Sequence, residues 1–474
     1  MAVGARVRRD VWRLSVPNKW HPIILNYAKA IARLQVLDTG NFADPRSWRH
    51  LAAIHGAALG GWPPGAHWNE CEHGSWYFLP WHRVYLHHFE KIVRQAVIDS
   101  GGPSNWALPY WNYSDPRRTN VVKLPPAFRE PAMPDGTPNP LYVQQRGVGI
   151  NSGASLPAGS VSTTAALAET DFTDPDGAGI ASSFGGGKSG RNHGGPLRGS
   201  LENVPHASVH GSIGGWMGAF ETAGRDPIFW LHHANIDRLW SRWLRTKTHI
   251  NPPVPQWLNE LFEFGNGQWY TQLGARDVLN TTATPLRYRY DDERPRPVRV
   301  VPQAARRQLE AAVRRGPPEK LGATKRDVPL GPSPTHAEIE VAAPEAAGLE
   351  SFAGGRQPGR AFLVLGNVRG KKVSAGSFDV YLNAPEDASP RQRDNYKAGT
   401  ISMFGVVESS ASDERHAREG ITVSLDITEL VRRLRSKPGW DAKKLRVTFV
   451  PVPDAAGEVK PGDVRVGSVS LHQG

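Results

Sequence analysis

The chain has 474 residues, a formal net charge of +12 and a single cysteine. Its length exceeds what one hydrophobic core usually supports, so we expect two unequal domains, and a lone cysteine excludes an internal disulfide framework. The sequence also lacks a long apolar run, an apolar signal segment after its first arginines and a nucleic-acid-binding motif, which predicts a cytoplasmic protein without nucleic-acid or membrane partners.

Three helices are expected in the first hundred residues. Apolar residues at spacings of three and four predict an amphipathic helix over 21–35. A second helix is expected over 47–59, where it carries His55 and ends at a pair of glycines. A third helix over 81–98 follows a proline suited to a first helical turn, and it carries His82.

The middle of the chain combines a long loop with two further helices. Residues 113–200 are rich in Gly, Ser, Pro and Thr and lack a helical or strand period, which predicts a loop excursion. A short helix near 203–211 and a long one near 226–246 follow, the latter beginning with Asp226 as N-cap and Pro227 in its first turn. We therefore expect four core helices in a bundle that holds two metals.

The last third of the chain has a different composition. Residues 291–335 are rich in Pro and Arg and are predicted to be a basic linker with one helix at 302–314. From 336 to 474, short apolar runs between turn residues predict an antiparallel β domain, interrupted by one helix at 428–435. The expected architecture is a mainly α domain over 1–290 followed by this β domain.

Six of the seventeen histidines fall into two groups of three within the helical segments and the loop between them. They are His55, His73 and His82, followed by His206, His210 and His233. Imidazole is a good copper ligand, and an all-nitrogen site disfavours Mg, Ca and Mn. Zinc is the rival metal, but it usually occupies one site with four ligands, whereas two three-histidine sets suit a coupled pair. The pattern predicts two copper ions and chemistry with dioxygen.

The spacing within the second group supports a metal site. His206 and His210 are four residues apart, so on a helix both imidazoles project from one face. Asp237 follows His233 by one helical turn and is expected to orient an imidazole. A surface ion pair with a neighbouring arginine is the alternative for this carboxylate.

Five longer strings surround or follow these histidines. They are Asp44-Pro45-Arg46-Ser47, Phe78-Leu79-Pro80-Trp81-His82-Arg83, the run from Asp226 to Trp240, Tyr288-Arg289-Tyr290, and Ser377-Phe378-Asp379-Val380-Tyr381-Leu382-Asn383. Together they resemble the tyrosinase, catechol oxidase and haemocyanin superfamily of type 3 copper proteins, and most closely its plant polyphenol oxidase branch. The resemblance covers both histidine segments and extends into the C-terminal region.

The resemblance implies a binuclear copper centre that oxidises phenolic small molecules with dioxygen. It assigns His55, His73 and His82 to the first copper and His206, His210 and His233 to the second, with His232 behind the ligands. The implied reaction converts o-diphenols to o-quinones. A copper chaperone is a further candidate partner, and the oligomeric state stays open.

For hydroxylation of a monophenol, the resemblance implies a water held by a glutamate and an asparagine. Glu202 matches the glutamate, four residues before His206. The asparagine position is Ala207, which cannot hold a water, and Asn203 is the candidate substitute or, alternatively, a helix cap. We therefore expect diphenol oxidation with weak or absent monophenol hydroxylation.

Three further residues receive roles from the resemblance. Cys71 is similar to a cysteine of fungal tyrosinases and molluscan haemocyanins, which implies a thioether bond to His73; an ordinary buried thiol is the alternative. Phe220 falls where a gate residue overhangs the second copper, unless it is a core aromatic. Phe404 is the candidate plug through which the C-terminal domain keeps the enzyme latent, so a cut within 291–335 should raise the catechol rate.

Two other functions use the same ligands. A haemocyanin-like oxygen carrier would bind dioxygen reversibly and form no quinone, whereas an o-aminophenol oxidase would differ in substrate. The plant-like strings and the lack of repeated functional units favour a polyphenol oxidase over a carrier.

Overall fold

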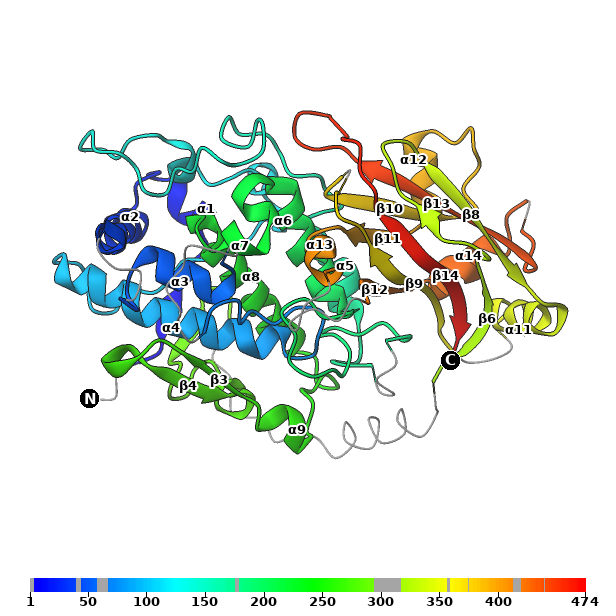
Figure 1. Ribbon diagram of the computed structural model, residues 1–474, viewed down its shortest axis with the longest axis horizontal. Helices are drawn as coiled ribbons and strands as arrows, with labels where there is room; N and C mark the ends of the chain where they lie inside the picture. The colour runs from blue at the N-terminus through cyan, green and yellow to red at the C-terminus, as the bar shows by residue number, and fades with distance from the viewer. Residues whose placement is uncertain are drawn as a thin grey trace.

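The protein consists of a mainly helical N-terminal part and a C-terminal part built around a large sheet, which lie side by side (Figure 1). The computed structural model describes residues 4–39, 44–57, 67–174, 179–293, 317–355, 359–373, 375–411, 419–438 and 440–474. Over these ranges, no helix combines the length and apolar character needed to span a membrane. The helix expected at 302–314 lies outside the described residues.

The described residues of the helical part form eight α-helices up to α8, and a ninth, α9, follows later in the chain. The first eight are α1 (Val11–Ser15), α2 (Pro22–Val36), α3 (Trp48–His55), α4 (Phe78–Asp99), α5 (Thr164–Ala168), α6 (Ser208–Ile213), α7 (Phe220–Ala223) and α8 (Pro227–Trp243). Helix α9 spans Pro255–Leu258, and shorter or irregular turns are η1 (Leu37–Thr39), η2 (Thr119–Val122), η3 (Pro126–Arg129), η4 (Glu202–Ala207), η5 (Gly215–Gly218), η6 (Gly267–Trp269) and η7 (Ala275–Val278).

The helices with the clearest start signals agree with the sequence analysis. Helix α8 begins at Pro227, and the Asp226 side chain accepts a hydrogen bond from the backbone N–H of Ile228. Helix α3 ends at His55, earlier than predicted, because Gly56 adopts an extended conformation where the chain meets Phe220. A Cβ atom at Gly56 would lie 2.2 Å from the carbonyl oxygen of Phe220, so only glycine fits this close approach.

The strands of the structure occur in both parts. They are β1 (Arg6–Arg8), β2 (Leu197–Arg198), β3 (Leu261–Phe264), β4 (Thr271–Gly274), β5 (Tyr288–Tyr290), β6 (Glu319–Ala323), β7 (Val328–Pro329), β8 (Thr335–Val341), β9 (Ala361–Arg369), β10 (Ser377–Leu382), β11 (Lys397–Ser402), β12 (Ile421–Asp426), β13 (Lys444–Val452) and β14 (Arg465–Gln473). The large sheet has the order β11-β10-β13-β8-β6-β14-β9-β12-β2, with β7 paired to β14.

The pairings of the large sheet are antiparallel as predicted, except at the edge where β2 joins β12 in parallel. Because β2 belongs to the N-terminal part, this pair connects the two parts of the molecule. The sheet also begins earlier than residue 336, since β6 pairs with β14 and β8 and therefore extends into the range predicted as linker.

Five helical segments accompany the described part of this sheet. They are α11 (Ala343–Ala353), α12 (Pro390–Arg393), η8 (Asp394–Tyr396), α13 (Val406–Ser409) and α14 (Thr428–Leu434). Helix α14 was predicted, whereas α11 was not. Leu349 and Phe352 of α11 are buried in the core of the C-terminal part, so packing against the sheet stabilises this alanine-rich helix.

The two parts have separate hydrophobic cores, with one exception that matters for the site. Phe404 follows strand β11 in the C-terminal part, yet it packs into the core of the helical part. It is only 3% exposed. The C-terminal part therefore inserts a side chain into its neighbour.

Candidate metal centre

The structure brings the six histidines singled out in the sequence into one buried cluster. His55 ends α3, His82 lies in the first turns of α4, and His233 lies in α8. The remaining three come from the loop before α4, from η4 and from α6, and they are His73, His206 and His210. All six side chains are buried.

Backbone carbonyls orient four of these imidazoles. His55 donates from Nδ1 to Phe220, His82 to Phe78, His206 to Glu202 and His210 to Met217, at 3.1, 2.8, 3.3 and 2.7 Å. A carbonyl oxygen can only accept, so Nδ1 carries the hydrogen and Nε2 keeps its lone pair. This arrangement fixes the ring and the tautomer as metal-binding histidines require.

The free nitrogen atoms converge without protein partners. Among the described residues, Nε2 of His55, His73, His82 and His206 is buried and has no hydrogen-bond partner. The Nε2 atoms of His210 and His233 lie 3.4 Å apart. A buried nitrogen without a partner is costly, and a metal ion would satisfy these lone pairs. Neutral imidazoles without carboxylates fit copper, so the residues present suit a pair of copper ions.

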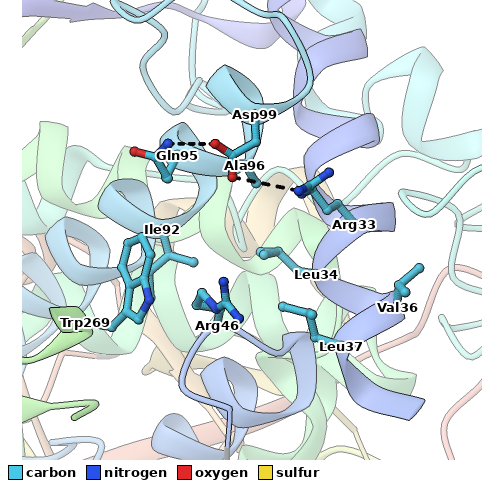
Figure 2. Close-up of a pocket in the computed structure, with 10 residues that line it drawn as sticks. All are labelled: Arg33, Leu34, Val36, Leu37, Arg46, Ile92, Gln95, Ala96, Asp99 and Trp269. Atoms are coloured by element: carbon cyan, nitrogen blue, oxygen red, sulfur yellow. Dashed lines mark hydrogen bonds and ion pairs between the residues drawn. The ribbon is translucent and has the colours of Figure 1, made fainter. Parts of the chain in front are cut away.

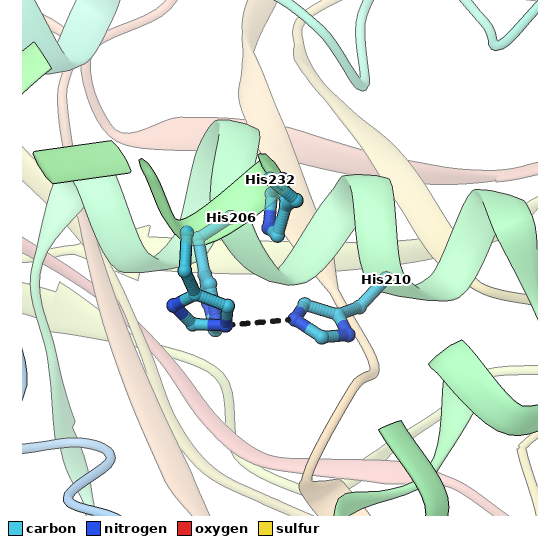
Figure 3. A group of neighbouring side chains, drawn as sticks. His206, His210 and His232 are labelled. Atoms are coloured by element: carbon cyan, nitrogen blue, oxygen red, sulfur yellow. Dashed lines mark hydrogen bonds between the residues drawn. The ribbon is translucent and has the colours of Figure 1, made fainter. Parts of the chain in front are cut away.

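The histidines form overlapping groups that could each hold an ion. Ligand atoms lie within 4.8 Å of one another in the groups His206, His210, His232 and His233; His55, Cys71 and His73; and His55, His82 and His233. The rings of His82 and His233 stack at 4.4 Å and join the two sets. Figure 3 shows His232 near His206 and His210. His232 was expected behind the ligands, but its ring lies close enough to belong to the second group itself.

Burial keeps these histidines neutral. Desolvation lowers the pKa of His82 from 6.5 to about 3, and it lowers the pKa of the other five well below 6.5. The neighbouring imidazoles act in the same direction, because a second charge in the cluster would be repelled. A neutral ring is the form that binds a metal ion.

Cys71 lies beside the ring to which the thioether was predicted. Its Sγ atom is 3.1 Å from Nδ1 of His73, and the thiol is completely buried. The same sulfur is 3.1 Å from Nδ1 of His193, a buried histidine that the sequence analysis did not identify. His193 lies in the glycine-rich loop, where neither period nor motif indicates a contact with Cys71.

Glu202 is buried at the start of η4. Both carboxylate oxygens accept a hydrogen bond from the backbone N–H of Gly74, at 2.8 and 3.0 Å. Burial raises the pKa of Glu202 to about 7, although the nearby Arg198 cation and the Gly74 N–H act against this shift. The carboxyl can therefore exchange a proton near neutral pH.

Asn203 binds the C-terminal part. Its Nδ2 donates to the carbonyl of Thr400 at 2.7 Å, and its Oδ1 accepts from the backbone N–H of Ser402 at 3.0 Å. Both partners belong to β11. The amide is thus engaged by a strand and does not cap a helix.

The two phenylalanines lie against different histidine groups. The ring of Phe404 stacks on His210 with 4.1 Å between centroids and 14° between planes, so the candidate plug covers the second group. Phe220 stacks on His73 at 4.2 Å and meets His55 edge-on. Helix α7 begins beside α3, where the carbonyl of Phe220 accepts from His55, and the gate role of Phe220 at the second copper stays a prediction.

Asp237 does not orient an imidazole, and it is not part of a surface ion pair. Its carboxylate binds Arg8 and Arg83, and it accepts hydrogen bonds from the hydroxyls of Tyr288 and Tyr290. All of these side chains are buried. Asp237 therefore ties β1, α4 and β5 to α8, and the Tyr288-Arg289-Tyr290 string acts through it.

Arg198 was missed in the sequence. It lies in β2, is buried, and donates to the carbonyl of Phe404 at 2.6 Å and of Ser402 at 3.2 Å. Its Nε atom lies 3.8 Å from Glu202. Only the pairing of distant strands brings this arginine to the plug segment, so no local signal could have revealed it.

A separate surface cavity of about 390 Å³ lies between α2 and α4 (Figure 2). Leu34, Leu37 and Ile92 line it together with Trp269, and Arg33 pairs with Asp99 at 4.0 Å on its wall. None of the six histidines contributes to its lining. This cavity is therefore separate from the histidine cluster.

Comparisons with known proteins agree with this site. Residues 45–246 match the family described as the common central domain of tyrosinase, and residues 317–474 match a domain of unknown function, DUF7868. The chain is 33% identical to the tyrosinase HcTyr1 of Hahella sp. (strain CCB-MM4), and the match covers 94% of this chain and 96% of that protein. It is 27% identical to a chloroplastic polyphenol oxidase of Malus domestica, over 94% of this chain and 74% of that protein.

Solved structures show the same fold. The structure of latent apple tyrosinase matches with a TM-score of 0.59 and 22% identity, over 99% of this chain and 98% of that one. A latent aurone synthase, also a polyphenol oxidase, matches with a TM-score of 0.63 and 21% identity, over 99% and 89%. Proteins of the tyrosinase family use a binuclear copper centre to act on phenols with dioxygen, and the histidine groups described above could bind such ions. The chain belongs to the tyrosinase and polyphenol oxidase family of type 3 copper proteins and is a copper oxidoreductase.

Proposed function

We propose that the protein oxidises o-diphenols to o-quinones and that α3, α4, α6 and α8 form the four-helix bundle of its dicopper centre. The first copper is assigned to His55, His73 and His82, and the second to His206, His210 and His233. When bound, the copper pair supplies the redox chemistry by which two diphenols give up four electrons and one dioxygen becomes two waters. The chain supplies ligand orientation, a dry site and proton transfer.

One observation carries this proposal. Four imidazoles donate Nδ1 hydrogens to backbone carbonyls, so their Nε2 lone pairs face a shared, buried space. Histidines that serve only packing would not leave several buried nitrogens without partners. The apolar rings of Phe78 and Phe229 pack against the imidazoles and keep water from them.

The substrate ring is proposed to take the place of the Phe404 ring. That ring stacks on His210 and lies 4.8 Å from Phe220, between an imidazole and a phenyl group. Such a slot accepts a flat aromatic ring by stacking. This overlap supports the proposed latency, because the substrate ring and the Phe404 ring cannot occupy the slot together.

Monophenol hydroxylation is proposed to be weak. A monophenol must lose its proton near neutral pH, and Glu202, with its pKa raised to about 7, is the proposed acceptor. The residue after His206 is Ala207, which offers no hydrogen bond, and the Asn203 amide is engaged by β11. A water beside Glu202 therefore lacks the partner that an asparagine in place of Ala207 would supply.

Steady-state rates of the copper-loaded full chain test the activity. We expect quinone from 4-methylcatechol, a slower reaction with o-aminophenol and the slowest with 4-methylphenol. Faster turnover of o-aminophenol would instead identify an o-aminophenol oxidase. Copper-loaded protein that binds dioxygen reversibly without oxidising 4-methylcatechol would refute the proposal.

Latency is tested by Phe404→Ala. Loss of the stacking on His210 should raise the 4-methylcatechol rate about two- to tenfold, since aromatic stacking contributes about 0.5–1.5 kcal/mol. Val407→Ala, at an exposed position three residues further on, is the matched control and should leave the rate unchanged. A cut between 294 and 316 should also raise the rate. Equal rates for Phe404→Ala and the unaltered protein would show that Phe404 does not block the site.

A further inference from the structure

The plug segment, Ser402 to Phe404, makes polar contacts with the helical part in addition to the stacking of the Phe404 ring. Arg198 donates from Nη2 to the carbonyl oxygen of Phe404 at 2.6 Å and from Nη1 to that of Ser402 at 3.2 Å. Its side chain is 2% exposed. Two hydrogen bonds of this buried cation therefore end on backbone atoms that belong to the C-terminal part.

Opening of the plug would leave Arg198 poorly satisfied. Its Nε atom has no hydrogen-bond partner among the described residues, and Glu202 lies 3.8 Å from it. Glu408, in α13 next to the plug, also favours the cation and belongs to the same segment. When the C-terminal segment moves away, Arg198 loses the carbonyls of Phe404 and Ser402 and the charge of Glu408, and it keeps only Glu202. An incoming carboxylate can replace the lost acceptors, because it matches the planar fork of guanidinium donors.

The covalent structure of Phe404 indicates how many bonds should separate such a carboxylate from an aromatic ring stacked on His210. In Phe404, the ring on His210 is joined through Cβ and Cα to the carbonyl that Arg198 binds. A phenol with the same two-carbon arm, ending in a carboxylate, can place its ring on His210 and its oxygens on Arg198 at once. The plug therefore has the outline of a 3-arylpropanoate.

We propose that Arg198 is a specificity-determining residue that binds the carboxylate of phenols whose ring carries a two-carbon arm ending in that group. This inference rests on the proposed phenol oxidation at the histidine cluster. Arg198 holds the plug segment in the closed protein and the substrate carboxylate in the open one. An uncharged diphenol uses the ring slot alone.

The test compares 3-(3,4-dihydroxyphenyl)propanoate with its methyl ester, using copper-loaded full chain opened by a cut between 294 and 316. We expect kcat/KM to favour the acid, and Arg198→Gln to lower the acid-to-ester ratio about tenfold to a hundredfold, as for hydrogen bonds between charged groups. Arg198→Lys keeps the charge without the fork and should give an intermediate ratio. The ratio does not depend on the folded fraction of a variant.

Two controls separate recognition from general weakening of the interface. Arg360→Gln removes the ion pair of Arg360 with Glu169, which joins the two parts of the molecule, and its pair with Asp426 within the C-terminal part. This variant should leave the ratio unchanged. The acid-to-ester ratio for 3,4-dihydroxybenzoate should not respond to Arg198→Gln, because its carboxylate is joined directly to the ring.

The outcomes distinguish this inference from the proposed function. Turnover of 4-methylcatechol with an acid-to-ester ratio that Arg198→Gln does not change would overturn the role of Arg198 alone. Failure to oxidise 4-methylcatechol would refute the proposed function. In that case calorimetry of 3-phenylpropanoate, which lacks oxidisable hydroxyls, still decides the matter: weaker binding to Arg198→Gln supports the carboxylate site, and equal binding overturns it.

Discussion

The helical part and the sheet part bury different kinds of side chain. In the described C-terminal part, the buried polar residues are serines and threonines apart from His472. The helical part buries many charged groups in addition to its histidines, among them Arg8, Glu90, Arg83, Arg146, Glu202, Asp226 and Asp237. The apolar core of the sheet consists of Leu, Ile, Val, Phe, Ala and Met.

The two parts are therefore stabilised by different interactions. A buried charge must be paired, and breaking such a pair is strongly destabilising, so the helical part depends on networks such as that of Asp237. Those networks fix α4 and α8, which carry His82 and His233. The sheet part depends on apolar burial, and it contacts the histidine cluster through the apolar side chain of Phe404.

The largest effect is expected from His210→Ala. Removal of one ligand should lower the copper content by about one ion per chain and reduce quinone formation more than about a hundredfold, since even groups that only orient ligands contribute ten- to a hundredfold. Metal analysis and 4-methylcatechol rates measure both. His249→Gln changes a buried histidine that stacks on Trp243, outside the cluster, and should retain full copper. Full copper in His210→Ala would remove His210 from the ligand set.

The next effect compares a buried with an exposed ion pair. Asp237→Asn should lower the free energy of unfolding by about 3–5 kcal/mol, because Arg8 and Arg83 lose their charged partner. Asp327→Asn breaks an exposed pair with Arg369 in the sheet part and should cost at most about 1 kcal/mol. Denaturant unfolding measures both, and similar losses would contradict the contrast between the two parts.

The two parts should also differ in their response to acid. Because the pKa of His82 falls from 6.5 to about 3 on folding, the unfolded chain binds a proton between these values that the folded chain does not. Stability of the metal-free helical part is therefore lost as the pH falls through that window. Carboxyl groups whose pKa rises on burial act in the opposite direction, among them Glu202 and Glu72 at about 7 and Asp10 at about 6. They are outnumbered by the histidines of the helical part whose pKa falls.

Amide hydrogen exchange of the metal-free protein at pH 7 and pH 5 tests this difference. After correction for intrinsic rates, exchange in α8 should accelerate more than exchange in β9 and β13, which pack in the apolar core of the sheet. Copper-loaded protein is the control, since bound metal keeps the imidazoles neutral. Equal acceleration in both parts would show that the buried histidines do not govern acid stability.

The sequence predicted those elements whose signals are local. Helix α8 has an N-cap, a first-turn proline and a clear helical period, and it begins where expected. The end of α3 depends on a contact between Gly56 and Phe220, which are distant in sequence. Strand β6 lies in a segment typical of a linker, and only its hydrogen bonds to β14 and β8 make it part of the sheet.

The same division applies to the site. The six histidines lie in recognisable strings, and the structure brings them together; their roles as ligands stay predictions. Asp237 lies at a spacing that suggested contact with an imidazole, but β1 and β5 offer it stronger charged and hydroxyl partners. Arg198 meets Phe404 only because β2 pairs with β12, a contact across more than 200 residues.

The smallest effect concerns Cys71, which lies in the helical part beside the first histidine group. A thioether to His73 would replace the thiol hydrogen and one ring hydrogen by a carbon–sulfur bond, with two electrons passed to dioxygen. The peptide containing both residues should then be lighter by two hydrogen atoms in mass spectrometry of the copper-loaded protein. Cys71→Ala should lower the catechol rate by less than about tenfold, because it removes a group that only orients a ligand.

His193 is an alternative partner for the Cys71 sulfur, because its Nδ1 is as close to that sulfur as Nδ1 of His73, at 3.1 Å. Its loop is held to the Cys71 segment by the ion pair of Arg191 with Glu72. In His193→Gln the mass difference should persist within the peptide of Cys71 and His73. A cross-linked pair of peptides joining Cys71 to His193 would contradict the assignment, and it would mean that the sulfur anchors the glycine-rich loop instead of a copper ligand.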